Sequence, residues 1–130
     1  MSLKTTVKPA NAVDEQQWQT VCQLEDLVAH SGVCALLEQN HNAAVTDEQV
    51  AIFHLPNTEQ QVFAIGNYDP IGQANVLYRG IVGSVGDDLV VASPLFKQHF
   101  SLQTGQCLQE DVQVKKYPVR ILDKQIQLLV

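Results

Sequence analysis

Two proline-containing loops carry most of the information about the fold. The chain reads Gly66-Asn67-Tyr68-Asp69-Pro70-Ile71-Gly72 and, after a glycine-punctuated segment, Val91-Ala92-Ser93-Pro94-Leu95-Phe96-Lys97-Gln98-His99-Phe100-Ser101-Leu102-Gln103-Thr104-Gly105. A proline follows Asp69 and another follows Ser93, and a residue that precedes proline is held in an extended conformation. The backbone of both loops is therefore locally restricted in shape.

This arrangement resembles the cluster-binding half of a Rieske iron–sulfur domain. In that family a C-x-H loop and a C-P-x-H loop hold a [2Fe–2S] cluster through two cysteines and two histidines. Asn67 and Asp69 stand where the first loop would carry its ligands, and Ser93 and Phe96 stand where the second would. Residues 100–105 match the strand and the Thr-Gly turn that follow the second loop.

All four ligand positions hold a different kind of side chain. Asn67, Asp69 and Ser93 offer oxygen atoms, whereas iron–sulfur clusters are held by thiolate and imidazole. Phe96 has no lone pair, and a ring buried where a ligand would point would stabilise the fold by ~1.5–3 kcal/mol. We therefore expect no cofactor and no metal in this chain, with the prolines giving the loops the rigidity that a metal would otherwise supply.

Further strings extend the resemblance to one family, the small subunit of cytoplasmic NAD(P)H-dependent nitrite reductase. The most characteristic are Gly32-Val33-Cys34-Ala35-Leu36-Leu37, Val76-Leu77-Tyr78-Arg79-Gly80 and Val91-Ala92-Ser93-Pro94-Leu95. The likeness covers most of the chain and departs at Glu38 to Asp47, which has the composition of a surface insertion. It implies an accessory subunit that binds a large catalytic subunit. That subunit would carry FAD, siroheme and an iron–sulfur cluster, and would reduce nitrite to ammonium in nitrate and nitrite assimilation.

The resemblance also implies where the partner binds, because the cluster end of a Rieske domain is the end that other proteins approach. The candidate interface comprises Tyr68, Pro70, Pro94, Lys97 and His99. No residue of this chain is expected to be catalytic. Two other functions remain open: a free-standing Rieske-type redox carrier with non-standard ligands, and a β-sandwich adaptor without a role in nitrogen metabolism.

The rest of the sequence predicts an all-β fold, a Rieske-like antiparallel β-sandwich with a small loop subdomain and few short helical turns. Short apolar segments separated by turn residues are typical of such domains. Residues 1–130 are expected to form one domain, with 1–14 as a flexible segment and 66–105 as the degenerate cluster-binding subdomain. The polar segment Gln39 to Gln49 reads as a surface loop, and Leu24 to Val28 as a helical turn. The clearest predicted strands are 18–22, 50–55, 62–65, 89–92, 100–102, 119–122 and 126–130.

Composition excludes several classes of function. The chain has 130 residues, of which 45% are hydrophobic, so it can form a packed core. Its formal net charge of −6 opposes binding to the phosphate backbone of nucleic acids. No apolar run approaches the ~20 residues that cross a bilayer, and the polar N-terminus lacks a secretory core. We therefore expect no nucleic-acid or membrane partner, and a cytoplasmic protein.

Three other patterns favour structural roles over chemistry. Ser93, His99 and Asp69 contain the residue types of a catalytic triad, but no G-x-S-x-G elbow surrounds the serine. Gly80, Gly83 and Gly86 match neither phosphate-binding fingerprint and are interpreted as turn residues. The four histidines are scattered, and the cysteines Cys22, Cys34 and Cys107 form no CxxC pair, so the cysteines are expected to be small buried side chains.

Overall fold

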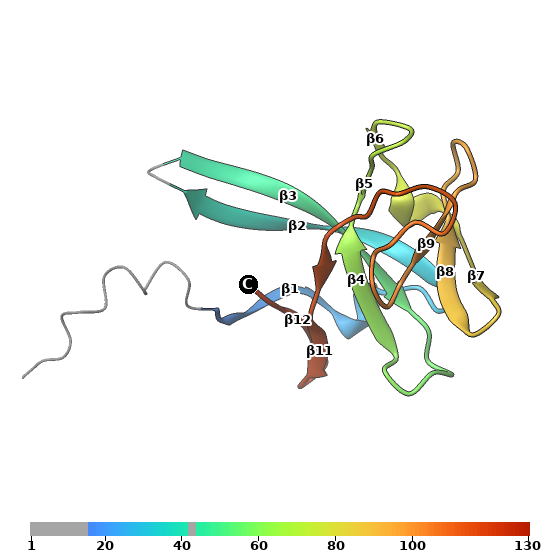
Figure 1. The fold of residues 1–130 in the computed structure, drawn as a ribbon. Coiled ribbons are helices and arrows are strands. Elements are labelled where there is room, and N and C mark those ends of the chain that lie inside the picture. The colour runs from blue at the N-terminus through green and yellow to red at the C-terminus, as the bar shows by residue number, and fades with distance from the viewer. Residues whose placement is uncertain (1–15, 42–43) are drawn as a thin grey trace, which may run out of the picture.

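The computed structural model describes residues 16–41 and 44–130, and the described chain is built from short antiparallel strands (Figure 1). A three-stranded sheet has the order β1 (Trp18–Gln23), β12 (Gln125–Leu129) and β11 (Val119–Leu122). A four-stranded sheet has the order β10 (Lys116–Tyr117), β4 (Val62–Gly66), β3 (Ala44–His54) and β2 (Ser31–His41). A second three-stranded sheet has the order β7 (Ile81–Val85), β8 (Asp88–Ala92) and β9 (His99–Ser101).

The remaining elements are small. β5 (Tyr68–Asp69) and β6 (Ala74–Asn75) pair as a two-stranded hairpin, and two 3-10 turns, η1 (Leu24–Asp26) and η2 (Leu77–Arg79), precede β2 and β7. The predicted all-β antiparallel architecture with few helical turns is confirmed. No helix of residues 16–41 and 44–130 has the length and apolarity needed to cross a membrane.

Most of the predicted strands are present. The segments 18–22, 62–65, 89–92 and 119–122 coincide with β1, β4, β8 and β11 to within one residue at each end. The length of Asp123-Lys124-Gln125 predicts a hairpin connection between the last two strands. Asp123 and Lys124 form it and both have positive φ, as a two-residue turn requires, whereas Gln125 is already part of β12. The expected flexible segment 1–14 lies outside the described residues.

The predicted surface loop from Gln39 to Gln49 is wrong. β2 and β3 run through this region as one long hairpin, and their pairing continues to His41 opposite Ala44. Figure 1 shows this hairpin extending away from the body of the molecule. A hairpin that leaves the core satisfies its backbone by cross-strand hydrogen bonds and needs no apolar face, so a polar composition did not distinguish it from a loop.

The four-stranded sheet is buried on both faces and separates two hydrophobic cores. The alternation at 51–55 predicts one polar face for β3, but neighbouring residues of β3 and β4 point into opposite cores. The tip core lies beneath the β7-β8-β9 sheet and contains Ala51, Phe53, Leu55, Phe63, Ile65, Leu77, Val91, Phe100, Leu102, Cys107 and Val114. The base core lies against the β1-β12-β11 sheet and contains Ala35, Leu37, Val50, Ile52, Val62, Ala64, Tyr117, Ile126 and Leu128.

The glycine-spaced segment is a hairpin rather than a string of turns. Gly83 lies inside β7, where nothing occupies the 4 Å around a hypothetical Cβ atom. Gly86 lies in the turn between β7 and β8 and has a φ of +61°, a value that glycine adopts without strain. The prediction of turn geometry therefore holds for Gly86 and is wrong for Gly83.

Candidate functional site: two loops joined by a buried hydrogen bond

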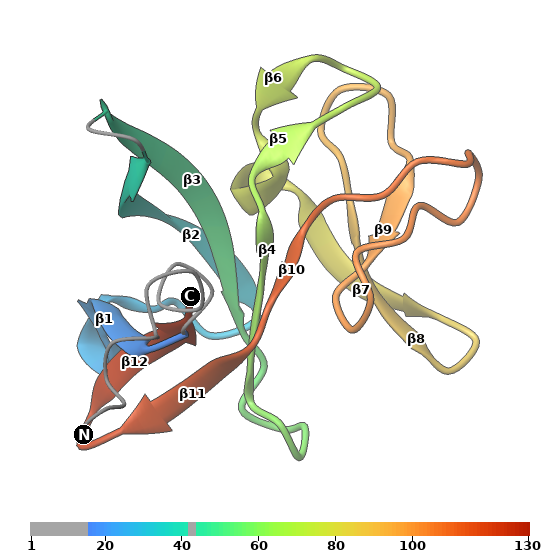
Figure 2. The same ribbon diagram turned by 60° about the vertical axis from the view of Figure 1, so that its left-hand side comes forward.

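The two loops lie side by side at one end of the molecule, as both ribbon views show (Figures 1 and 2). The first leaves β4 at Gly66 and forms the β5–β6 hairpin. The second leaves β8 after Ala92 and enters β9 at His99. We call this end of the molecule the tip.

A direct hydrogen bond joins the two loops at their centre. The Ser93 hydroxyl donates to Oδ2 of Asp69 at 2.5 Å. Both side chains are buried, Asp69 being 0% exposed and Ser93 1% exposed. Hydrogen bonds to charged groups are short and strong, and burial from water strengthens them further. Two of the four positions that resemble cluster ligands are therefore bonded directly to each other.

Asp69 also fixes the shape of its own loop. Its Oδ1 atom accepts hydrogen bonds from the backbone N–H groups of Ile71 and Gly72, at 2.8 and 3.0 Å. Gly72 leaves room for the other loop, because a Cβ atom there would lie 3.2 Å from Cβ of Leu95 and 3.0 Å from Oδ2 of Asp69. The carboxyl group thus organises one turn and binds the second loop at the same time.

The second loop is closed by its own backbone. The Ser93 N–H donates to the carbonyl oxygen of Gln98 at 2.9 Å, and the Lys97 N–H donates to the carbonyl oxygen of Ser93 at 3.0 Å. Lys97 has a φ of +64°, which lets the chain turn back toward β9. The loop therefore presents residues 94–97 outward from a fixed base.

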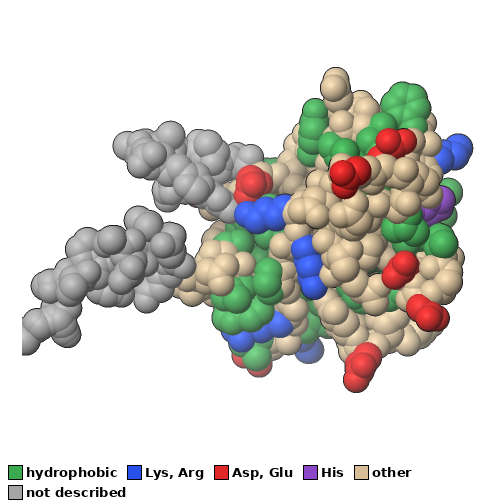
Figure 3. All heavy atoms as spheres, viewed as in Figure 1, with side chains coloured by type: hydrophobic (Ala, Val, Ile, Leu, Met, Phe, Trp, Pro, Cys, Tyr) green, Lys and Arg blue, Asp and Glu red, His purple; other side chains and the backbone are tan. Residues whose placement is uncertain are grey.

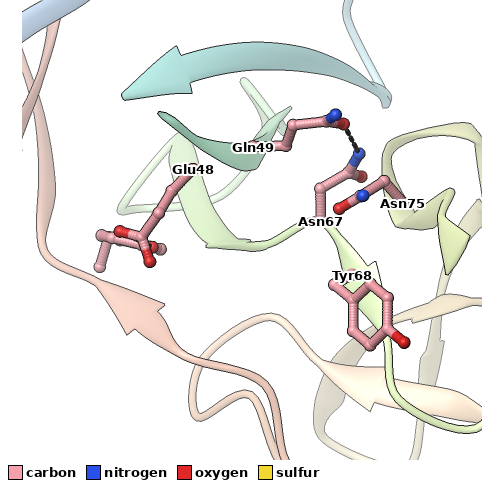
Figure 4. A pocket seen from close by; sticks show the side chains of 6 residues that line it. Glu48, Gln49, Asn67, Tyr68 and Asn75 are labelled. Carbon is pink, nitrogen blue, oxygen red and sulfur yellow. Dashed lines mark hydrogen bonds between the residues drawn. The ribbon is translucent and has the colours of Figure 1, made fainter. Parts of the chain in front are cut away.

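Asn67 links the first loop to β3 and η2. Its Oδ1 accepts a hydrogen bond from the Tyr78 N–H at 2.8 Å, and its Nδ2 donates to Oε1 of Gln49 at 3.1 Å (Figure 4). The Nδ2 atom also lies 3.7 Å from Sγ of Cys34. Asn67 is fully buried, and its amide hydrogen bonds hold the first loop against β3 and η2. Neither partner of Asn67 could be predicted from the sequence, because Gln49 is 18 residues and Tyr78 is 11 residues away along the chain.

Phe96 does not fill the position of a missing ligand. Its ring is 63% exposed, so the expected burial and its stabilisation are wrong. Tyr68 is 48% exposed and Leu95 is 44% exposed at the same end of the molecule. We refer to Tyr68, Leu95 and Phe96 as the tip patch. Figure 3 shows hydrophobic side chains gathered there, over β5, β6 and the neighbouring loop.

The other predicted interface residues surround the tip patch unevenly. Pro94 and Lys97 are exposed, whereas Pro70 and His99 are half-buried. The Nδ1 atom of His99 lies 2.9 Å from Nε2 of Gln109, so its ring bonds to the loop after β9 and not to Ser93. The side chains of Ser93 and Asp69 meet, but His99 does not join them.

The donor set at the tip does not fit an iron–sulfur cluster. Asn67, Asp69 and Ser93 supply hard oxygen or amide groups that are already engaged with protein partners. Phe96 supplies none. Within the part of the chain that the structure describes, no group of three or more His, Cys, Asp or Glu side chains could hold a metal ion.

The cysteines differ in environment. Cys107 is buried as expected, but Cys22 is half-buried and Cys34 is exposed, which corrects the expectation for those two. Burial, with a smaller contribution from Asp26, raises the pKa of Cys22 to about 11. Burial also raises the pKa of Cys34. Both thiols are therefore held in the less reactive protonated form at neutral pH.

A polar pocket of about 260 Å³ lies beside the first loop (Figure 4). It is lined by Glu48, Gln49, Asn67, Tyr68, Asn75 and Tyr117. The Tyr117 hydroxyl donates to Oε1 of Glu48 at 3.3 Å, and burial together with Glu48 raises the pKa of Tyr117 above its ordinary value. The pocket shares Tyr68 with the tip patch, and its lining is mostly polar.

Comparisons with known proteins agree on one family. The family model of the Rieske-like [2Fe-2S] domain matches residues 17–129. The chain is 44% identical over 113 residues to the nitrite reductase (NADH) small subunit of Escherichia coli (strain K12), a match that covers 86% of this chain and 96% of that subunit. The solved structure of the Escherichia coli protein NirD is similar with a TM-score of 0.75 at 41% identity, over 89% of this chain and 98% of that one.

A further relative places a similar sequence inside a longer protein. The nitrite reductase [NAD(P)H] large subunit of Klebsiella oxytoca is 32% identical over 111 residues. That match covers 85% of this chain and 10% of the large subunit.

Proposed function

Because this chain belongs to the family of nitrite reductase small subunits with a Rieske-like [2Fe-2S] domain, we propose that it is the accessory subunit of an NAD(P)H-dependent nitrite reductase. The whole enzyme transfers electrons from a reduced nicotinamide to nitrite and forms ammonium. The observation that carries this function is the 44% identity to the Escherichia coli small subunit across 96% of that subunit. The chain acts in the cytoplasm, without a nucleic-acid or membrane partner.

Its partner is the large catalytic subunit, which holds the FAD, siroheme and iron–sulfur cluster of the enzyme. The Klebsiella oxytoca large subunit supports this pairing, because it carries a segment similar to this chain within one polypeptide. Segments that are fused in one protein and separate in another commonly work together. A separate small subunit would then bind the large subunit non-covalently, in place of the segment that the longer relative carries within its own chain.

This chain itself carries no cofactor. The donor atoms at the ligand-like positions support this, since Asp69 and Ser93 are bonded to each other and Phe96 points outward. Its contribution to the enzyme is therefore binding and positioning, not electron transfer. A free-standing redox carrier would need a coloured metal centre for which these residues offer no thiolate or imidazole.

The large subunit docks on the tip patch and the residues around it. Exposed aromatic and apolar side chains on loops fixed by buried hydrogen bonds are suited to anchor an interface. Lys97 and Pro94 at the rim complete this surface. The firm internal bonding of both loops means that little conformational freedom is lost on binding.

Reconstitution tests the function. The large subunit is purified alone and then mixed with this chain, and ammonium formation from nitrite and NADH or NADPH is measured. We expect the two chains to co-purify and the activity to rise on mixing, with no visible absorption from this chain alone. About two irons per isolated chain with a Rieske-type spectrum would overturn the cofactor-free role, and failure to bind the large subunit would leave the adaptor function.

Substitutions test the docking surface. Tyr68→Ala should weaken binding to the large subunit by ~2 kcal/mol or more, as a buried hot spot does. Lys97→Glu should mainly slow association and change its salt dependence. Leu122→Ala is the control, since Leu122 is 44% exposed on β11, in the sheet that flanks the base core. If Leu122→Ala weakens binding and the tip substitutions do not, the partner docks on a sheet face.

A further inference from the structure

The edge strand of the β7-β8-β9 sheet, β7, has features that suit it to pair with a further strand. β7 has β8 as its one neighbour in that sheet among the residues described. Edge strands of monomeric proteins are usually protected by a lysine, a proline or a bulge. β7 reads Ile81-Val82-Gly83-Ser84-Val85 and has none of these.

The side chains of β7 add an apolar surface to this open edge. Ile81 is 77% exposed and Val85 is 44% exposed. Each of them is two residues away from Gly83, and alternate residues of a strand point to the same face of the sheet. Ile81, Gly83 and Val85 therefore share one face. Gly83 has no neighbouring atom within 4 Å of a hypothetical Cβ atom, so the middle of the strand can be approached closely.

The sequence of β7 is complementary to itself in the antiparallel direction. If two copies pair about a two-fold axis at Gly83, Ile81 of each copy lies opposite Val85 of the other, and Val82 lies opposite Ser84. Both apolar side chains then gain a cross-strand partner, an arrangement that stabilises sheets.

Charges at the two ends of β7 follow the same symmetry. Arg79 lies in η2, two residues before the strand, and Asp87 lies in the turn two residues after it. The same axis brings the Arg79 end of one β7 beside the Asp87 end of the other. Both residues are exposed, and no ion pair is formed by either one within the described residues. Two pairs of opposite charge would therefore flank the two apolar pairs.

We propose that β7 is a self-association surface, through which two copies of this chain form one continuous sheet of six strands, β9-β8-β7-β7-β8-β9. The partner is a second copy because the apolar pairs, the glycine at the axis and the charged ends are all matched by one register. A strand pair of this length buries less than the ~1,200 Å² of a standard stable interface, so the isolated dimer is weak, with a dissociation constant between about 10 µM and 1 mM.

Sedimentation equilibrium of the whole chain tests this proposal first. Across that concentration range we expect a monomer–dimer equilibrium, and Ile81→Lys should weaken it about tenfold or more. Leu122→Lys, on the edge strand β11 of another sheet, is the matched control and should leave it unchanged. Arg79→Glu and Asp87→Lys should each weaken the dimer, and the double variant should recover it because the charges are again opposite.

Disulfide trapping tests the register itself. In a Cys34→Ser background, Gly83→Cys places two thiols at the axis, within the ~7 Å between Cα atoms that a disulfide allows. Val85→Cys on the same face would separate the two thiols by four residues along the strands, ~13 Å, and should not cross-link. Oxidised glutathione should therefore yield a covalent dimer only from the Gly83→Cys variant.

A chain that stays monomeric up to about 1 mM, and that shows no preference for cross-linking at residue 83, would overturn the proposal. A dimer that is insensitive to Ile81→Lys would overturn it as well. If Ile81→Lys leaves the monomer–dimer equilibrium unchanged and weakens binding to the large subunit, β7 serves that partner and the self-association proposal is overturned. The sedimentation and cross-linking outcomes do not depend on whether the chain supports nitrite reduction.

Discussion

The bond between Asp69 and Ser93 joins the two tip loops directly through protein atoms. Each side chain is short, so the two loops must approach closely for the 2.5 Å contact, and Gly72 permits that approach. The carboxyl group accepts three hydrogen bonds in a site without water access. Loss of any donor would leave a buried acceptor poorly satisfied.

Ser93→Ala should lower the free energy of unfolding by about 1–3 kcal/mol, the usual cost of leaving a buried polar group without its partner. Asp69→Asn should cost less than Asp69→Ala, because an amide retains an acceptor for the backbone N–H groups of Ile71 and Gly72. Urea denaturation measures all three. Ser84→Ala, at an exposed serine of β7, is the control, and equal stability of Ser84→Ala and Ser93→Ala would contradict the role assigned to the bond.

The sequence predicted the types of side chain at the tip but not their partners. The sequence shows that Asn67, Asp69 and Ser93 carry oxygen atoms that could act as ligands. The contact between Asp69 and Ser93 joins residues 24 positions apart, so it depends on the folded structure. Phe96 is exposed, and it is the neighbouring Leu95 whose side chain lies against Gly72 of the first loop. An aromatic side chain in such a loop is free to face solvent or a partner.

Among the elements, the short turn after β9 is the most constrained. Gly105 has a φ of +83°, and a Cβ atom there would collide with the carbonyl oxygen of Val114. The Gly105 N–H donates to Ser101 and its carbonyl oxygen accepts from Val114, both within 2.9 Å, so the backbone cannot move away easily. The Thr-Gly turn in the sequence predicted this feature correctly.

Gly105→Ala should lower the free energy of unfolding by about 1–3 kcal/mol from the unfavourable φ alone, and by more if the collision is not relieved. Gly83→Ala should have the opposite effect, a gain of up to ~1 kcal/mol, because it adds a side chain to a strand at a site with open space. Thermal and chemical denaturation at low protein concentration compare the two variants. A tolerated Gly105→Ala would show that the turn can rearrange.

The elements that could not be predicted are those in which apolar residues do not recur with the spacing of a strand. β2 and β3 continue past Leu37 and Glu48 into a polar hairpin, and β5, β6 and β10 are two residues long. Short strands form where neighbouring strands place a backbone beside them, which local propensity does not encode. The apolar runs of β3 and β4 predicted both strands. They did not predict that both faces of β3 are buried.

At the scale of the whole molecule, the proposed absence of a metal has a measurable consequence. Proteins whose loops are closed by a metal lose stability when it is removed, because binding energy is folding energy. Here side-chain hydrogen bonds close the tip, so EDTA or a strong iron chelator should leave the melting temperature unchanged. Differential scanning calorimetry with and without chelator checks this. A clear drop would indicate a metal held through Asp69 or a histidine.

The sheet shared by the two cores also bears on how such a chain can be rearranged genetically. Ala51, Phe53 and Ile65 lie outside the 66–105 segment yet fill the core beneath it. A gene fragment encoding only residues 66–105 would therefore yield a peptide that lacks part of its hydrophobic core. A chain from which these residues are deleted would expose one face of β3 and β4 to solvent. We expect recombination to move this domain between proteins only as a whole, and the match to the Klebsiella oxytoca large subunit spans 85% of this chain.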